Sequence, residues 1–515
     1  MLGDDKSGRS PGPNAGAGLD HALGEDDGLR GVERTKLTRL SLEVDDRSGE
    51  FVDEDAVPGV GGSAWGVSPW YTFVIVTAAF TTDNIAGPYA FQQSGWIAGT
   101  LFFIFGVATS YYTGRLLGNQ SIPEQDEASY PKITERAFGV CGHYFALTMQ
   151  VLSYFTLVVV LLVKLGLWMS LAARHVNEEN RLCISTLIVV SAAILAVLVQ
   201  TPTFSHVMPL AALSIAISLL RLILIYVQMS SYEMGTNCSP TYEIPEEEAG
   251  SQVLTFFRGL STFMWMLGGH GMFPEEIREM REPQRHFYKA LNWSFVIIVA
   301  QYVLTIVPTY FVWGAWTSPL LVDNLPDDNT TSAIVILSVV WMFIEAAISN
   351  LLLCLTVEVH VYNLSPLKQC LREPGTLVPP VVKRVVHRLG VVLAQLFFGL
   401  MLQDAGVGNI QAFVGAFGFG ALTFWLPYIL EMFRVPNYRG LHTVLLIIGV
   451  VVSVFGMYTS MASITAATSG GLFSSECRHL DLLDPLDGPC IYDSLIVSND
   501  TFYGNDTVVL TETQP

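Results

Sequence analysis

Four ionisable residues stand deep inside long apolar stretches of the sequence: Asp83, Lys164, Arg221 and Glu345. An ionisable group at membrane depth is costly to bury, so each is a candidate for binding an ion or a substrate. Asp83 is the first candidate to carry a coupling proton or to contact a substrate ammonium group, and Glu345 is the second. A structural alternative stays open, because two acids and two bases can also neutralise each other as two buried ion pairs.

His270 is a third candidate for ion coupling, because histidine ordinarily titrates at about pH 6.5. The alternative is a structural role in which it caps carbonyl groups of an unwound segment. Glu275 and Glu276 follow closely in the chain. We expect them to cap a helix start, where carboxylates favour the helix dipole, or to form a cytosolic gate, and capping is favoured.

These residues lie at or near two interrupted apolar stretches. The stretch WYTFVIVTAAFTTDNIAGPYAFQQSGW contains Asp83 and then Gly87-Pro88, and FFRGLSTFMWMLGGHGMFPEEIREM contains residues 268–271 and then Pro274. Proline breaks a helix, and unsatisfied backbone at membrane depth is tolerated only where it lines a cavity. The alternative is a pair of kinked helices packed in a bundle. Two matching interruptions five spans apart favour a repeat of five plus five spans with substrate at the broken helices.

The composition indicates that these residues belong to a membrane protein. Of the 515 residues, 51% are hydrophobic and 14% charged, and the mean hydropathy is +0.44, whereas soluble proteins carry roughly 25% charged residues. This excludes a disordered chain and a nucleic-acid binder and disfavours a soluble enzyme. A membrane helix needs about 20 mostly apolar residues. The stretches that meet this expectation are 69–92, 97–118, 143–172, 183–200, 204–230, 253–276, 288–314, 332–360, 386–404, 407–432 and 441–465.

The charge divides the chain into three predicted regions. Residues 1–65 hold 14 acidic and 7 basic residues, and residues 466–515 hold 8 acidic residues and one basic residue. The first segment is predicted to be a disordered, acidic cytosolic tail, since it cannot bury a core. Residues 66–465 form the predicted transporter domain, and residues 466–515 the extracellular or lumenal acidic tail. A cytosolic N-terminus places 13 loop Lys and Arg residues in the cytosol and three on the other side, as the positive-inside rule requires.

Two features on the non-cytosolic side suggest the secretory pathway. Four glycosylation sequons fall there, at Asn237, Asn329, Asn499 and Asn505. Four cysteines also fall on this oxidising side. We expect Cys183 to pair with Cys238, and Cys477 with Cys490; free thiols are the alternative for each pair.

Several classes of function lack the residues they need. No phosphate-binding Gly-x-x-x-x-Gly-Lys-Ser/Thr run, no His/Cys cluster with metal-ligand spacing and no Gly-x-Ser-x-Gly turn occurs in the sequence. We therefore expect a protein that is not an enzyme and that holds no metal and no organic cofactor.

Four motifs resemble the amino acid/auxin permease family of eleven-span transporters. They are IAGPYAFQQSGW (85–96), YYTGRLLG (111–118), YPKITERAFG (130–139) and GGHGMFPEEIREMREP (268–283). The resemblance implies an all-α polytopic membrane protein with eleven helices, in which a five-plus-five inverted repeat of the leucine-transporter type is followed by one extra helix. It also implies secondary transport of amino acids or related small zwitterions, with H⁺ or Na⁺ as the coupling ion.

The resemblance also implies where substrate binds. Family members hold the amino and carboxylate groups on exposed backbone of the first and sixth helices, and half-helix ends suit this chemistry. Three aromatic side chains beside the breaks, Tyr89, Phe263 and Trp265, are candidate gates, although packing is the more common role. One departure is that Thr81 and Asp83 stand where the family usually has glycines, and Asp83 then adds charge to the site. The predicted substrate-binding residues are Asp83, Asn84, Ile85, Ala86, Gly87, Phe263, Met264, Trp265, Leu267, Gly268 and Gly269.

The leading hypothesis is an ion-coupled amino acid symporter that works by alternating access. The alternative is a membrane amino acid sensor that binds the same ligand and signals through its N-terminal tail; a channel is disfavoured by the broken helices. We expect a small-molecule substrate and the lipid bilayer as partners, no nucleic acid, and a monomer. The expected location is the plasma membrane or a vacuolar or lysosomal membrane.

Overall fold

The computed structural model describes residues 69–80, 83–176, 182–201, 207–231, 242, 252–326, 328–361, 380–435, 439–468, 480–482 and 495–497. The regular secondary structure of these residues is helical apart from one antiparallel pair of short strands. Strands β1 (Leu480–Leu482) and β2 (Leu495–Val497) pair with Leu480 opposite Val497. The predicted N-terminal tail lies outside the described residues.

Eight helical stretches are long and apolar enough to cross a membrane, by length and composition, within the described part of the chain. Seven of them contain one long helix each: α4 (Trp96–Ser121), α5 (Tyr130–Val176), α7 (Met208–Ser231), α10 (Pro283–Trp313), α11 (Asn329–His360), α13 (Pro380–Leu402) and α16 (Arg439–Ala467). The eighth joins α14 (Val407–Val414), the π-helical segment η7 (Gly415–Trp425) and α15 (Leu426–Arg434).

The other three predicted spans contain shorter helices. Helix α6 (Ile184–Leu198) has 15 residues. The first span consists of α2 (Pro69–Phe80), η1 (Asn84–Ala86) and α3 (Gly87–Ser94). The sixth consists of α8 (Gln252–Met266), η4 (His270–Met272) and α9 (Phe273–Glu279). Pro88 and Pro274 each lie in the first turn of the second half-helix, where a missing N–H costs nothing.

Short 3₁₀ turns connect several of the long helices. They are η2 (Ile122–Glu127), η5 (Gly314–Trp316) and η6 (Leu321–Asn324). Helix α5 begins 13 residues before the predicted span at residue 143, because Gly139, with φ of 66°, links an additional helical segment to it. Only glycine adopts such a φ at little cost.

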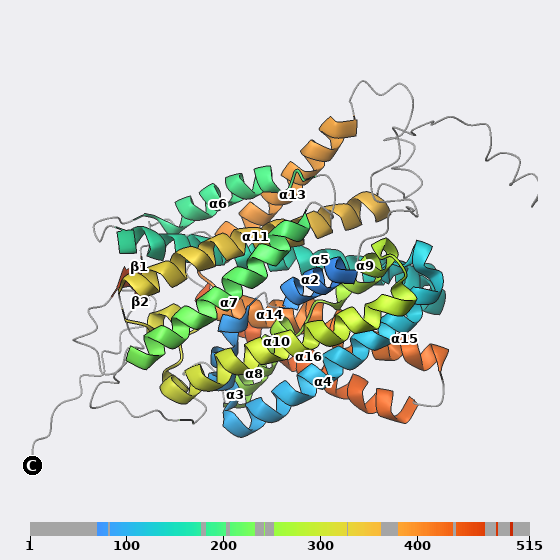
Figure 1. Ribbon diagram of the computed structural model, residues 1–515, viewed down its shortest axis with the longest axis horizontal. Helices are drawn as coiled ribbons and strands as arrows, with labels where there is room; N and C mark the ends of the chain where they lie inside the picture. Colours follow the sequence, from blue (N-terminus) through green and yellow to red (C-terminus); the bar gives the residue numbers. More distant parts are fainter. Residues whose placement is uncertain are drawn as a thin grey trace, which may run out of the picture. The chain divides into compact units, whose positions relative to one another are not determined.

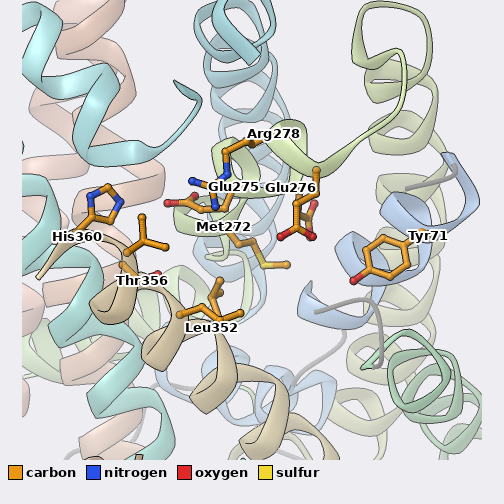
Figure 2. A pocket seen from close by; sticks show the side chains of 11 residues that line it. Tyr71, Met272, Glu275, Glu276, Arg278, Leu352, Thr356 and His360 are labelled. Atoms are coloured by element: carbon orange, nitrogen blue, oxygen red, sulfur yellow. The ribbon is translucent and has the colours of Figure 1, made fainter. Parts of the chain in front are cut away.

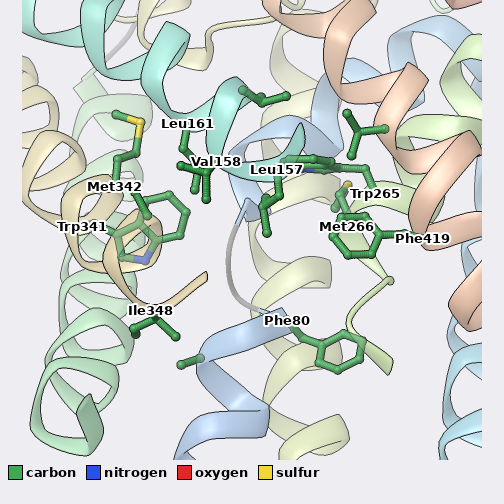
Figure 3. Packing of buried hydrophobic residues seen from close by; sticks show 14 of the residues in the cluster. Phe80, Leu157, Val158, Leu161, Trp265, Met266, Trp341, Met342, Ile348 and Phe419 are labelled. Atoms are coloured by element: carbon green, nitrogen blue, oxygen red, sulfur yellow. The ribbon is translucent and has the colours of Figure 1, made fainter. Parts of the chain in front are cut away.

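The broken helices lie among the long ones (Figure 1). Helix α3 packs against α8, α2 against α10, and α11 against both α5 and α7. The main hydrophobic cluster surrounds the two breaks and includes Phe80, Trp265, Met266 and Phe419. Figure 3 shows these side chains together with Leu157, Val158 and Leu161 of α5, which belong to the same cluster. The breaks are therefore enclosed in a packed apolar interior, where every free backbone group needs a partner.

Candidate functional site

One hydroxyl group connects the ends of the two broken helices. Tyr302 of α10 is fully buried, and its hydroxyl lies within hydrogen-bond distance of the carbonyl oxygens of Phe80 and Met266, at 2.6 Å from the second. Phe80 is the last residue of α2 and Met266 the last residue of α8. The last carbonyls of a helix lack intrahelical partners, so this tyrosine supplies a donor at the point where both chains unwind.

Other side chains satisfy the backbone of the second break. The Ser110 hydroxyl of α4 donates to the Leu267 carbonyl at 2.8 Å. The Gly269 N–H donates to the Thr423 hydroxyl at 3.4 Å, and the Gln150 amide donates to the Gly271 carbonyl at 2.7 Å. In this conformation, protein groups make hydrogen bonds to much of the backbone that is predicted to bind substrate.

Asp83 is the centre of a polar cluster at the first break. Its Oδ2 accepts hydrogen bonds from the Lys164 ammonium group, from the Trp265 indole N–H at 3.2 Å and from the Gln411 amide. Asp83 is 5% exposed and Lys164 is 6% exposed. A buried carboxylate is stable only when it is paired and hydrogen-bonded, and these donors from three helices meet that requirement.

The four deep charges, Asp83, Lys164, Arg221 and Glu345, form one ion pair and not two. Asp83 pairs with Lys164. Arg221 and Glu345 are both 1% exposed and lie within electrostatic reach of each other, but they make no direct salt bridge within the described residues. Arg221 donates to the Ser338 hydroxyl at 3.3 Å, and its guanidinium carbon lies 4.3 Å from the centre of the Trp341 ring. The alternative of two buried ion pairs is therefore wrong for Arg221 and Glu345.

His270 contacts α4 and not the Asp83 cluster. Its Nε2 lies 2.6 Å from the Ser110 carbonyl oxygen and 3.1 Å from the Thr113 hydroxyl. Because a carbonyl only accepts, Nε2 carries the proton of this bond. The ring packs against Phe80 and Phe273 and is fully buried. This geometry fits a histidine that fastens the second break to α4.

The remaining predicted substrate-binding residues divide between the two breaks. The Asn84 amide donates to the Thr305 hydroxyl at 3.1 Å, and the Ala86 N–H donates to the Asp83 carbonyl. Ile85 and Gly87 are buried beside them, and Gly87 lies against Ile306. Leu267 and Gly268 are buried at the second break, and Gly268 faces the Phe419 ring.

Sequence reasoning missed Tyr302, Gln411 and Phe419. Gln411 and Tyr302 are polar residues in predicted spans, and that signal alone marks many residues of this chain. Phe419 carries no polar signal; it lies against Gly268, and its ring packs edge-on to Trp265 with the ring centres 5.7 Å apart.

Aromatic side chains close one end of the broken helices. Phe91 of α3 packs against Phe263 of α8 and Tyr310 of α10, with ring centres 5.4 and 5.7 Å apart. Trp96 at the start of α4 adds to this cluster, 4.9 Å from Tyr310. The predicted gate residue Phe263 therefore packs within the cluster. Met264 is buried, and its sulfur atom lies 3.9 Å from the Ser453 hydroxyl oxygen. Tyr89 lies against Gly408 of α14.

The other end of the broken helices holds a cavity (Figure 2). It contains about 520 Å³ of empty space, its open mouth included. Residues of α2, α9 and α11 line it, together with Met272 from the second break. We call this cavity the acidic vestibule, because Glu275, Glu276 and Glu279 line it. One end is thus closed by aromatic rings while the other is hollow.

The predicted modifications fall mostly outside the described residues. Cys183 is disulfide-bonded, while its predicted partner Cys238 lies outside them, as do Cys477 and Cys490. Asn329 is exposed as the first residue of α11. The other three sequons, at Asn237, Asn499 and Asn505, are not among the described residues.

Comparison with known proteins identifies the family. The profile described as "Transmembrane amino acid transporter protein" matches residues 66–468. The chain is 23% identical over 396 residues to amino acid transporter AVT1B of Arabidopsis thaliana, covering 74% of this chain and 68% of that protein. It is 20% identical over 413 residues to GABA transporter 1 of the same plant, covering 76% of this chain and 88% of that protein.

Solved structures with some likeness are also transport proteins. A Na⁺-coupled sialic acid symporter has a TM-score of 0.43 at 14% identity, covering 78% of this chain and 91% of the other. The inward-facing conformation of Mhp1 has a TM-score of 0.43 at 13% identity, covering 79% and 93%. The match of the family profile over most of the chain decides the assignment. The chain belongs to the transmembrane amino acid transporter family, and it is a membrane transporter and not an enzyme.

Proposed function

We propose that the protein is a secondary active transporter that moves amino acids or related small zwitterions by alternating access. The observation that carries the proposal is the pair of broken helices whose ends meet at the Tyr302 hydroxyl, beside the buried Asp83–Lys164 pair. Unwound backbone at this depth offers N–H and carbonyl groups to a zwitterion. The closed aromatic end and the hollow acidic end fit one state of an alternating cycle.

The proposed architecture has eleven spans, with α2/η1/α3 and α8/η4/α9 as spans 1 and 6 of a five-plus-five inverted repeat. Its N-terminus lies in the cytosol, so that the acidic vestibule opens on the cytosolic side. The membrane is the plasma membrane or an acidic organelle, and the working unit is a monomer.

We assign ion coupling to Asp83 first, with Glu345 and His270 as further candidates. The Lys164 ammonium group already neutralises Asp83. A built-in cation at the first break favours H⁺ over Na⁺ as the coupling ion, because a proton can leave or join the pair without a separate metal site. Glu345 has a buried Oε1 without a hydrogen-bond partner among the described residues, which suits a second protonation site.

Uptake into liposomes tests the proposed function. Purified protein is reconstituted, and labelled amino acids, γ-aminobutyrate included, are offered with an inward H⁺ gradient, an inward Na⁺ gradient or neither. We expect saturable uptake that the H⁺ gradient drives. Saturable binding without flux would instead support the sensor, and uptake without saturation would support a channel.

Replacement of Asp83 tests the coupling residue. Asp83→Asn keeps the size of the side chain but leaves the Lys164 charge unpaired, so we expect pH-driven uptake to fall to background. The double variant Asp83→Asn with Lys164→Met removes both charges and serves as the folding control. We expect it to regain the stability of the wild type but not pH-driven uptake. Unchanged pH-driven uptake in Asp83→Asn would remove Asp83 from the mechanism.

A further inference from the structure

The polar groups in the acidic vestibule that have no hydrogen-bond partner in the described part of the chain include those of Glu276, Tyr71 and Thr356, which come from three different helices. Glu276 of α9 is 7% exposed, and neither of its carboxylate oxygens has a hydrogen-bond partner among the described residues. Tyr71 of α2 is 5% exposed, and its hydroxyl also lacks a partner within that part of the chain. Both line the cavity. Buried polar groups are normally satisfied, so these two point to a ligand.

A capping hydrogen bond does not account for Glu276. Its oxygens would have to accept hydrogen bonds from the first N–H groups of α9, and they accept none from the described residues. The neighbouring Glu275 differs, because its Oε1 accepts a hydrogen bond from the Gln150 amide at 2.9 Å. Glu276 therefore lies in the first turn of α9, where a carboxylate favours the helix dipole, but it makes no capping hydrogen bond with the described residues.

The charges around Glu276 favour a positive ligand. Glu275 and Glu279 lie within electrostatic reach of it, and Arg278 is the one Lys or Arg side chain among the lining residues that the structure describes. Figure 2 shows Glu275 and Glu276 projecting from α9, with Leu352 and Thr356 of α11 to one side of Glu276 and Tyr71 to the other. A partly buried carboxylate with like charges nearby gains most from a cation or a proton.

We propose that the acidic vestibule is a cation site in which Glu276 and Tyr71 receive an ammonium group on the route of the substrate. The inference rests on the proposed function, because a substrate that moves between the second break and the open end of the cavity would pass Glu276 and Tyr71. An ammonium group has three donors, which suit the two Glu276 oxygens and the Tyr71 hydroxyl. The same chemistry serves a substrate ammonium or a free monovalent cation, and the experiment separates these sources.

Binding is measured without transport. The full-length protein in detergent is heated with increasing methylammonium chloride, with NaCl, or with N-methyl-D-glucamine chloride to hold ionic strength constant. We expect methylammonium to raise the melting temperature of the wild type. Glu276→Gln should shift the half-maximal concentration upward at least tenfold, and Glu276→Asp should retain most of the effect. Glu127→Gln, an exposed acid outside the vestibule, is the matched control and should behave as the wild type.

The outcomes separate the two sources and the two proposals. Stabilisation by methylammonium alone assigns the site to ammonium groups, and equal stabilisation by Na⁺ assigns it to free monovalent cations. Identical curves for wild type and Glu276→Gln would overturn the cation site. That result would leave uptake into liposomes intact, whereas failure of uptake with normal methylammonium binding would overturn the transport proposal alone.

Discussion

At the scale of single residues, the site depends on side chains that supply hydrogen bonds where the backbone cannot. Tyr302 serves the ends of two helices with one hydroxyl, and Asp83 collects donors from three helices. A net hydrogen bond is worth about 0.5–1.5 kcal/mol, whereas an unsatisfied buried group costs about 1–3 kcal/mol. The loss of one such side chain therefore removes hydrogen bonds from both breaks.

Tyr302→Phe removes only the hydroxyl group. We expect a lower melting temperature and at least a tenfold loss of uptake, because the Phe80 and Met266 carbonyls lose their shared donor. Tyr310→Phe on the same helix is the control, since the Tyr310 hydroxyl is buried without a partner among the described residues. It should match or slightly exceed the wild type in thermal melting. Equal stability and uptake for both variants would contradict the bridging role of Tyr302.

At the scale of elements, glycines let helices approach at the breaks. A Cβ atom placed on Gly268 would lie 2.4 Å from the Phe419 Cβ and 2.8 Å from the Met264 carbonyl oxygen. Both distances are shorter than packed atoms allow. The π-helical segment η7 thus fits against the second break only because residue 268 lacks a side chain.

Gly268→Ala should destabilise the protein by about 1–3 kcal/mol through overpacking, and uptake should be lost. Because the closest contact is with the Phe419 Cβ, which alanine keeps, and the next backbone contact is with the Met264 carbonyl oxygen, Gly268→Ala with Phe419→Ala should not recover the stability. Gly390→Ala in α13 is the control, since nothing lies within 4 Å of the position that the added methyl group would take, and it should be neutral or stabilising. Thermal melting and uptake are measured on all three. A Gly268→Ala variant that equals Gly390→Ala would contradict this packing.

A buried ion pair fastens α13 to its neighbours. Arg388 is fully buried, although the sequence places it at the cytosolic start of the predicted span 386–404. Its guanidinium donates to both Glu358 oxygens of α11, at 2.9 and 3.3 Å, and to the carbonyls of Val199 and Thr201 at 2.7 Å each. The arginine therefore belongs to the packing of three helical segments as well as to the charge pattern of the loops.

Arg388→Met should cost about 3–5 kcal/mol, because the Glu358 carboxylate stays buried without its partner. Arg384→Met is the control: Arg384 lies 3.9 Å from the same carboxylate, and its side chain is 30% exposed, so less than about 1 kcal/mol is expected. The double variant Arg388→Met with Glu358→Gln should regain part of the stability. Chemical or thermal unfolding in detergent measures the stability of these variants. Equal losses of stability for Arg388→Met and Arg384→Met would contradict the structural role of the buried ion pair between Arg388 and Glu358.

The sequence predicts the elements better than the contacts between them. Proline and glycine mark both breaks, since their backbone chemistry acts locally, and the predicted spans coincide with helices to within a few residues at most boundaries. Tertiary pairing is different. Nothing in the order of residues shows that Lys164 meets Asp83 while Arg221 and Glu345 stay apart, because that depends on how helices far apart in the chain rotate against each other. Phe419 could not be predicted for the same reason.

At the scale of the whole molecule, the net charge of −19 has little to do with the transport site. Residues 1–65 and 466–515 each carry a net charge of −7 (7 − 14 and 1 − 8), which leaves −5 for the rest of the chain. Proton-linked stability instead depends on single carboxyl groups whose surroundings differ between the folded and unfolded states. Two aspartates between α10 and α11, outside the predicted spans, show opposite behaviour.

Burial raises the pKa of Asp323 to about 7, although the Ser318 hydroxyl donates to it at 2.6 Å and acts in the other direction. Burial also opposes ionisation of Asp328, but the Thr331 N–H and the Gln228 amide outweigh it and hold the pKa of Asp328 below its ordinary value. Asp328 accepts the Thr331 N–H as the N-cap of α11. The two carboxyls thus differ in the pH range over which they affect stability.

The pH dependence of unfolding follows from these directions. An unfolded aspartate ionises at about pH 3.9, so between about pH 4 and pH 7 the folded protein keeps a proton on Asp323 that the unfolded chain has released. Folded stability from this group is therefore full below pH 4 and is lost as the pH rises to 7. The measurement is the difference in melting temperature, wild type minus Asp323→Asn. We expect this difference to fall between about pH 4 and pH 7 and to level off above pH 7.

Asp328→Asn supplies the contrast. The lowered pKa of Asp328 means that its contribution is complete above about pH 4, so the difference between wild type and Asp328→Asn should be positive and flat from pH 4.5 to pH 7.5. Melting curves in one detergent at fixed ionic strength, taken for the three proteins, give both differences. A flat difference for Asp323→Asn would show that Asp323 is ionised in the folded state throughout this range. The connection between α10 and α11 would then not respond to the acidity of the compartment that it faces.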